Sequence, residues 1–108
     1  MSTKQNETID AKAFTKNLDE KMNLGALIRA FREAEEISQV NMAEQLGVSK
    51  QFLSDVENGR KKVGIPLIQK FATELGFSPD TFVRVYLRDQ LREAGMKGYD
   101  VHLVKHAS

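Results

Sequence analysis

Residues 38–59 read SQVNMAEQLGVSKQFLSDVENG, and this stretch decides the fold. Ser38 and Ser49 can each cap the start of a helix, because a serine oxygen accepts a backbone N–H that has no partner there. Gly47 suits a left-handed turn between the two helices, which a side chain would oppose. The inward positions are small or apolar: Met42, Ala43, Leu46, Leu53 and Val56. Two helices joined by so short a link must cross steeply, so the stretch predicts a helix-turn-helix.

The flanking sequence predicts three more helices. The first has apolar residues at the i, i+3, i+4, i+7 spacing of one helical face: Leu24, Leu27, Ile28 and Phe31. It is expected to span residues 24–36. A fourth helix is expected to begin at Pro66 and to end at Gly76. A fifth is expected from Pro79, after the cap residue before it, to about Ala94.

The two ends of the chain differ from this helical centre. Residues 1–22 are mostly polar and predict a flexible leader, with room for a marginal helix around 10–21. The stretch 99–103 alternates as a strand does and places these residues on one face: Tyr99, Val101 and Leu103. The expected fold is therefore all-α with five helices, in which a helix-turn-helix domain at 23–78 follows a polar N-terminal leader and a short strand ends the chain. Residues 79–108 would hold a dimerisation helix and that strand.

Composition excludes several classes of protein. The 108 residues suffice for about one domain, and 41% apolar with 29% charged residues is typical of a globular chain. Sixteen basic against fifteen acidic residues leave a net charge of +1, which excludes a histone-like coat for polyanions. The absence of cysteine excludes a disulfide scaffold, a thiolate zinc finger and a cysteine nucleophile. No signal peptide or membrane span is apparent, so a cytoplasmic location is expected.

The sequence offers no pattern for catalysis. No nucleophile elbow, phosphate-binding glycine loop or dinucleotide fingerprint is present. His102 and His106 are four residues apart, but they lie in a tail that is not expected to be helical. We therefore expect no catalytic residue, no cofactor and no metal site.

A set of residues spread over 24–75 keeps fixed spacings: Leu24-Gly25, Ile28-Arg29, Arg32, Ser38-Gln39, Met42-Ala43, Gly47-Val48-Ser49, Leu53-Ser54, Glu57-Asn58-Gly59, Pro66-Leu67, Phe71-Ala72 and Leu75-Gly76. In this set the sequence resembles the phage-repressor, or xenobiotic-response-element, family of bacterial regulators. The resemblance covers about half of the chain and implies a lambda-repressor-like helix-turn-helix domain. Glu36 departs from the pattern, since the family usually has glycine there. The turn after the first helix is therefore expected to be strained or shaped differently.

The resemblance implies that the helix at about 49–58 reads bases in the major groove. Lys50 and Gln51 lie in its first turn, and Asp55 lies one turn later. Lysine suits guanine O6 and N7, glutamine can pair with adenine through two hydrogen bonds, and aspartate can accept one from cytosine N4. The alternatives are a merely solvated helix face, and an Asp55 that holds a neighbouring lysine. Phe52 stays open between covering the edge of the core and touching a thymine methyl group.

Contacts to DNA phosphates are expected on both sides of that helix. By resemblance they come from these residues: Ser38, Gln39, Ser49, Asn58, Arg60, Lys61 and Lys62. The alternative for the three consecutive cations is an ordinary exposed loop. Arg32 and Glu57 occupy positions where the family often has an ion pair between the first and third helices. These two residues are expected to stabilise the fold and not to read bases.

A dimer interface is expected from the fifth helix and the tail. Their apolar residues exceed what one face can bury: Val83, Tyr86, Leu87, Leu91, Tyr99, Val101 and Leu103. The alternative for the helix is simple burial. A lone strand leaves its backbone groups unpaired, so the tail would pair with a second copy, bind another protein or fray.

The function expected from all this is a homodimeric repressor that binds an inverted-repeat operator in double-stranded DNA. Regulation would come from a protein partner or from proteolysis, because no sensor domain is apparent. One alternative is an antitoxin that also controls its own operon, with the leader 1–22 or the strand 99–104 binding a toxin. The other alternative is a module for protein contacts in which DNA binding has been lost.

Overall fold

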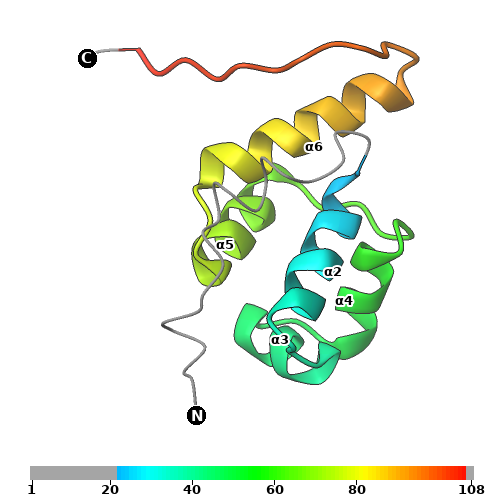
Figure 1. Cartoon of the computed structure of the whole chain (residues 1–108), viewed down its shortest axis with the longest axis vertical. Coiled ribbons are helices and arrows are strands. Elements are labelled where there is room, and N and C mark those ends of the chain that lie inside the picture. The colour runs from blue at the N-terminus through cyan, green and yellow to red at the C-terminus, as the bar shows by residue number, and fades with distance from the viewer. Residues whose placement is uncertain (1–21, 107–108) are drawn as a thin grey trace.

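A computed structural model describes residues 22–106, and five helices lie in that range (Figure 1). In chain order they are α2 (Leu24–Ala34), α3 (Gln39–Leu46), α4 (Lys50–Glu57), α5 (Ile65–Leu75) and α6 (Pro79–Glu93). Four of them begin and end close to the residues that the sequence predicts, and the first ends two residues earlier. The expected leader lies outside the described residues, apart from Met22.

The helix-turn-helix is α3, a three-residue turn and α4. Ser38 caps α3, with its Oγ accepting the N–H of Asn41 at 3.0 Å. Ser49 caps α4 in the same way, accepting the N–H of Phe52 at 3.0 Å. Gly47 ends α3 in the left-handed conformation, with a φ of 74°. Both predicted serine caps and the predicted left-handed glycine turn are therefore confirmed.

Helix α2 ends at a strained turn. Glu36 has a φ of 58°, the left-handed region that favours glycine, and is the one described residue other than glycine there. The N–H of Ile37 reaches back to the carbonyl of Arg32 at 2.9 Å, and closes the turn. A side chain in this conformation costs about 1–2 kcal/mol.

Helices α2 and α4 pack with their backbones in close approach. A Cβ atom added at Gly25 would lie 2.2 Å from the carbonyl oxygen of Val56. No side chain fits in that space, so the glycine lets the first turn of α2 rest directly on the last turn of α4. This contact fixes the position of α4 against α2.

The core lies between these helices and the pair α5 and α6. Its largest fully buried side chains are Phe71, Phe82, Ile28, Met42, Leu46, Leu53 and Ile68. Phe77, in the turn between α5 and α6, lies between two other rings. Its ring centre is 4.8 Å from that of Phe31 and 4.8 Å from that of Phe82. Packed aromatic pairs of this kind stabilise beyond their buried area, so they hold α6 against α2.

Helix α6 also holds the start of α2 through polar contacts. The Oδ2 of Asp89 accepts the N–H of Leu24 at 2.8 Å, and Arg88 donates from Nη2 to the carbonyl of Met22 at 2.7 Å. Burial raises the pKa of Asp89, and the hydrogen bond from Leu24 opposes that shift. The first turn of α2 is thus fixed from two sides, by α4 and by α6.

The outer side of α6 is less exposed than the sequence suggests. Val83 and Tyr86 are half-buried and pack against the core, and Leu87 and Leu91 are also half-buried. Part of the apolar surplus expected for a dimer interface is therefore used within the chain.

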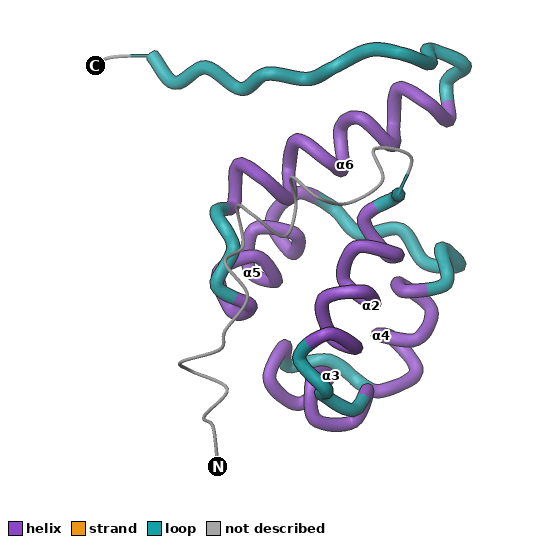
Figure 2. The backbone as a smooth tube through the Cα atoms, in the orientation of Figure 1, coloured by secondary structure: helices purple, strands orange, loops and turns teal. Residues whose placement is uncertain are grey.

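The predicted C-terminal strand is wrong for the described residues. The segment after α6 is loop as far as residue 106, and Figure 2 shows no strand anywhere in 22–106. Along that segment Tyr99 and Leu103 are 55% and 42% exposed, and Val101 is half-buried. A strand requires a neighbouring strand for its backbone hydrogen bonds, and the described chain offers none. The alternation of residue types at 99–103 was therefore not enough to predict a strand.

Candidate nucleic-acid interface

The outer face of α4 is polar and open to solvent. Lys50 and Gln51, in its first turn, are exposed, whereas Leu53 and Val56 face the core and are buried. A helix can read bases only if its polar face can enter the groove without unfolding the domain. Helix α4 meets that condition at Lys50 and Gln51, two of the three residues expected to read bases.

Asp55 is engaged within the chain. Its Oδ1 accepts hydrogen bonds from the Nε2 of Gln51 at 2.9 Å and from the Nε of Arg60 at 3.2 Å. Its side chain is 26% exposed. Of the sequence-derived possibilities, the structure shows Asp55 holding neighbours, namely a glutamine and an arginine and not a lysine.

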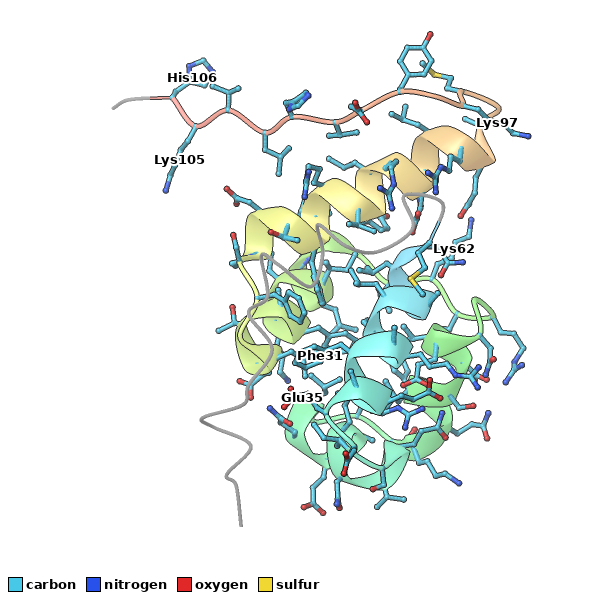
Figure 3. All side chains as sticks on the ribbon, viewed as in Figure 1. Phe31, Glu35, Lys62, Lys97, Lys105 and His106 are labelled. Carbon is cyan, nitrogen blue, oxygen red and sulfur yellow. The ribbon has the colours of Figure 1, made fainter. Side chains whose placement is uncertain are left out.

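The three cations after α4 are exposed; two of them pair with carboxylates, and the third lies over an aromatic ring. Arg60 pairs with Asp55 at 3.2 Å, and the Nζ of Lys61 lies 5.1 Å from the ring centre of Phe52. Lys62, which is labelled in Figure 3, pairs with α6, where the Oε1 of Glu93 is 2.6 Å from its Nζ. Glu93 raises the pKa of Lys62, by hydrogen bond and by charge.

Phe52 is half-buried and packs against the core. Its ring therefore covers the core edge, as one of the two sequence-derived possibilities states, and its outer side carries the ammonium of Lys61. Through this contact Phe52, in α4, is joined to Lys61 in the loop that follows the helix.

Arg32 and Glu57 form the ion pair that the family resemblance implies. The guanidinium meets both carboxylate oxygens, Nε to Oε2 at 2.8 Å and Nη2 to Oε1 at 3.1 Å. Arg32 also donates to the carbonyl of Ile37 at 3.0 Å, and Gln39 donates from Nε2 to Glu57 at 3.0 Å. The hydrogen bond to Glu57 raises the pKa of Arg32. Helices α2, α3 and α4 are thereby joined at one buried carboxylate.

The remaining residues expected to touch phosphate lie at helix ends. Ser38 and Ser49 are exposed, and because each Oγ accepts a backbone N–H, its own hydroxyl proton stays available for a phosphate. Asn58 ends α4 and donates from Nδ2 to the carbonyl of Ser54 at 2.8 Å. Gln39 is the first residue of α3, and the cations of 60–62 lie in the loop that follows α4.

Some of these contacts were absent from the sequence-derived picture. The pair Gln51 and Asp55 had a visible signal, because residues four apart share a helix face. The contact between Lys62 and Glu93 joins residues 31 apart in the sequence, and no local sequence pattern predicts it.

Comparison with known proteins identifies the family to which this chain belongs. The family model described as "Helix-turn-helix domain" matches residues 23–84, more than half of the chain. This chain belongs to the helix-turn-helix family of transcriptional regulators. The resemblance drawn from the residue spacings is thus confirmed.

Phage and bacterial proteins are among the relatives. The ImmF control region 10 kDa protein of Bacillus phage phi105 is 51% identical over 37 residues, 34% of this chain and 41% of that protein. The immunity repressor protein of the same phage is 29% identical over 62 residues, 57% of this chain and 43% of that protein. An uncharacterized HTH-type transcriptional regulator of Mycobacterium tuberculosis is 33% identical over 87 residues, 81% of this chain and 60% of that protein.

A solved structure agrees with the fold. It is that of a hypothetical transcription factor, NHTF, from Neisseria, with a TM-score of 0.53 and 26% sequence identity. The match covers 70% of this chain and 90% of that one. By contrast, the chain spans less than half the length of the two phage proteins.

Within residues 22–106, none of the helices has the length and apolar character needed to cross a membrane.

Proposed function

We propose that this protein is a sequence-specific, DNA-binding transcriptional regulator that places α4 in the major groove. The observation that carries the proposal is the exposed pair Lys50 and Gln51 at the start of α4, directly beside three exposed cations at 60–62. Base edges require polar side chains on a projecting helix, and phosphates require positive charge on its flanks. The family to which the chain belongs supports the same function.

Lys50 and Gln51 are proposed to read bases. An ammonium group donates to O6 and N7 of guanine, and a glutamine amide accepts from N6 and donates to N7 of adenine. Both side chains are exposed in the first turn of α4, where the helix N-terminus also favours the approach of an anion. A recognition helix needs only a few such contacts for each half-site.

The phosphate contacts are proposed to come from Arg60, Lys61 and Lys62, with the serine hydroxyls at the starts of α3 and α4. Because the net charge of the whole chain is only +1, DNA affinity depends on where the cations lie. The carboxylate that pairs with Lys62 is exposed, so a phosphate can replace it. The Arg60 side chain is 60% exposed and has five N–H donors, so it can meet a phosphate while it stays paired with Asp55.

A homodimer is proposed as the form that binds an operator. Two copies read two half-sites about one DNA turn apart, and so obtain the affinity that one small module lacks. In support, four large apolar side chains after α6 are exposed in the single chain: Met96, Tyr99, Leu103 and Val104. Sedimentation should show a dimer at micromolar concentration, and a chain lacking residues 96–108 should be a monomer.

Repression is proposed as the outcome, because a protein bound at a promoter blocks access of the polymerase. One relative, from Bacillus phage phi105, carries the name immunity repressor protein. The second candidate function is that of an antitoxin, favoured by the same exposed apolar tail. In that case a partner protein, and not a second copy, would cover the tail, and a neighbouring toxin gene would be required.

Two alanine variants test the central proposal. Gln51→Ala should weaken binding to the cognate duplex by about 1–3 kcal/mol and relax the preference at one base pair. Lys61→Ala should weaken binding to all duplexes similarly and lower the salt slope by about one unit. If Gln51→Ala leaves affinity and preference unchanged, the assigned reading face is wrong.

A further inference from the structure

One carboxylate links a proposed base reader to a proposed phosphate contact. The Oδ1 of Asp55 accepts from the Nε2 of Gln51 at 2.9 Å and from the Nε of Arg60 at 3.2 Å. The Nη2 of Arg60 is also 3.2 Å from this oxygen. The backbone carbonyl of Asp55 accepts the N–H groups of Arg60 and Lys61, at 2.8 and 3.2 Å. One residue therefore holds both the side chain before it and the loop after it.

The chemistry of the contact fixes which way the Gln51 amide faces. An ionised carboxylate only accepts hydrogen bonds, so the group turned toward Asp55 must be the NH₂ group. The Oε1 of Gln51 then points away from Asp55, and the second N–H of the amide stays available. Gln51 and Asp55 are four residues apart on one face of α4, so their contact needs no other element of the fold.

We propose that Asp55 is a positioning residue that makes Gln51 prefer adenine to guanine. The inference rests on the proposed DNA-binding function. Adenine offers an N6 donor and an N7 acceptor, which match the outward Oε1 and the remaining N–H of Gln51. Guanine offers two acceptors, O6 and N7, so the outward Oε1 would oppose O6. A free amide would turn over and donate to guanine; one held by Asp55 does not.

Arg60 completes the arrangement. A carboxylate close to the DNA backbone repels phosphates, and an adjacent guanidinium offsets that charge. The Asp55 side chain is 26% exposed, and the arginine side chain that meets its Oδ1 is 60% exposed. Asp55 is thus occupied by two donors, and Gln51, which is exposed, is the side chain presented to a base.

The experiment is selection of bound duplexes from a random pool, followed by competition between duplexes that differ at one base pair. The base pair read by Gln51 is the one at which Gln51→Ala loses its preference. Asp55→Ala should reduce the preference for adenine over guanine at that pair by about tenfold. Asp55→Asn should keep it within about twofold, because its Oδ1 still accepts from Gln51.

Glu44→Gln is the matched control. It removes one negative charge from an exposed position on α3, and its base preferences should equal those of the wild type. The unfolding temperature of each variant, measured by thermal denaturation, checks that the domain stays folded. We expect it to, because a helix tolerates alanine and asparagine at a partly exposed position.

Two results would overturn this inference and leave the proposed DNA-binding function standing. In one, Asp55→Ala keeps the full preference at the Gln51 base pair. In the other, it relaxes a different base pair and leaves that one intact, which would make Asp55 a direct base reader. A wild-type protein that selects no sequence at all would overturn the proposed function, and the inference with it.

Discussion

Two ion pairs of nearly equal length have opposite surroundings. The Nε of Arg32 is 2.8 Å from Glu57, and the Nζ of Lys62 is 2.6 Å from Glu93. The side chains of the first pair are 11% and 1% exposed, and those of the second are 73% and 52% exposed. Distance therefore does not distinguish a contact that holds the fold from one that can be exchanged for a ligand, whereas burial does.

The physical reason is the solvent. Water screens the charges of an exposed pair, so breaking the pair changes stability little. A buried carboxylate that loses its partner keeps its charge without hydration, which is strongly unfavourable. Three side-chain donors of Arg32 and Gln39 satisfy Glu57, so the buried site is nearly complete. The comparison predicts that the two pairs will respond in opposite ways to substitution.

The largest effect is expected at the buried pair. Arg32→Ala should lower the free energy of unfolding by about 3–5 kcal/mol, because it leaves Glu57 buried and unpaired by an arginine. Urea denaturation followed by circular dichroism measures this. DNA binding should be lost together with the folded state and should return when the folded state is restored at low temperature or in osmolyte.

Arg29→Ala is the matched control on the same helix. Arg29 and Glu33 form an exposed pair at 3.3 Å, with side chains 53% and 57% exposed. Its loss should change the free energy of unfolding by about 0.5 kcal/mol or less. Equal effects of the two arginine substitutions would contradict the distinction by burial.

A smaller effect, on binding, is expected at the exposed pair. Glu93→Gln frees the ammonium of Lys62 from its carboxylate and removes a negative charge near the proposed phosphate contacts. DNA affinity should rise by up to about fivefold at low salt, for cognate and random duplexes alike. Fluorescence anisotropy over a range of salt concentrations measures it. Weaker binding by Glu93→Gln would show that Glu93 positions Lys62 for DNA.

The same contrast explains how much the sequence could predict. Ser38, Gly47 and Ser49 act on their own neighbours, within a few residues, so the helix-turn-helix could be placed from the sequence alone. The pair Arg32 and Glu57 came from family resemblance, since 25 residues separate them.

The errors and omissions concern long-range contacts. Whether Tyr99–Leu103 forms a strand depends on a neighbouring strand, and alternation of residue type cannot supply one. Glu93 meets Lys62 only because α6 packs beside the loop after α4. Glu36 is an exception of a different kind, since a single unexpected residue correctly indicated strain in the turn.

The smallest effect is expected at a carboxylate of intermediate burial, Asp89. Its Oδ2 accepts from Leu24, its Oδ1 is buried without a hydrogen-bond partner among residues 22–106, and burial raises its pKa above 3.8. The folded state then holds a proton that the unfolded chain releases, so this group lowers stability as pH rises from about 3.8 through the folded pKa. Asp89→Asn removes that titration. The difference in unfolding free energy between variant and wild type should therefore grow in favour of the variant over this pH range, in urea denaturation series. A difference that stays constant with pH would place Asp89 with the exposed, fully hydrated carboxylates.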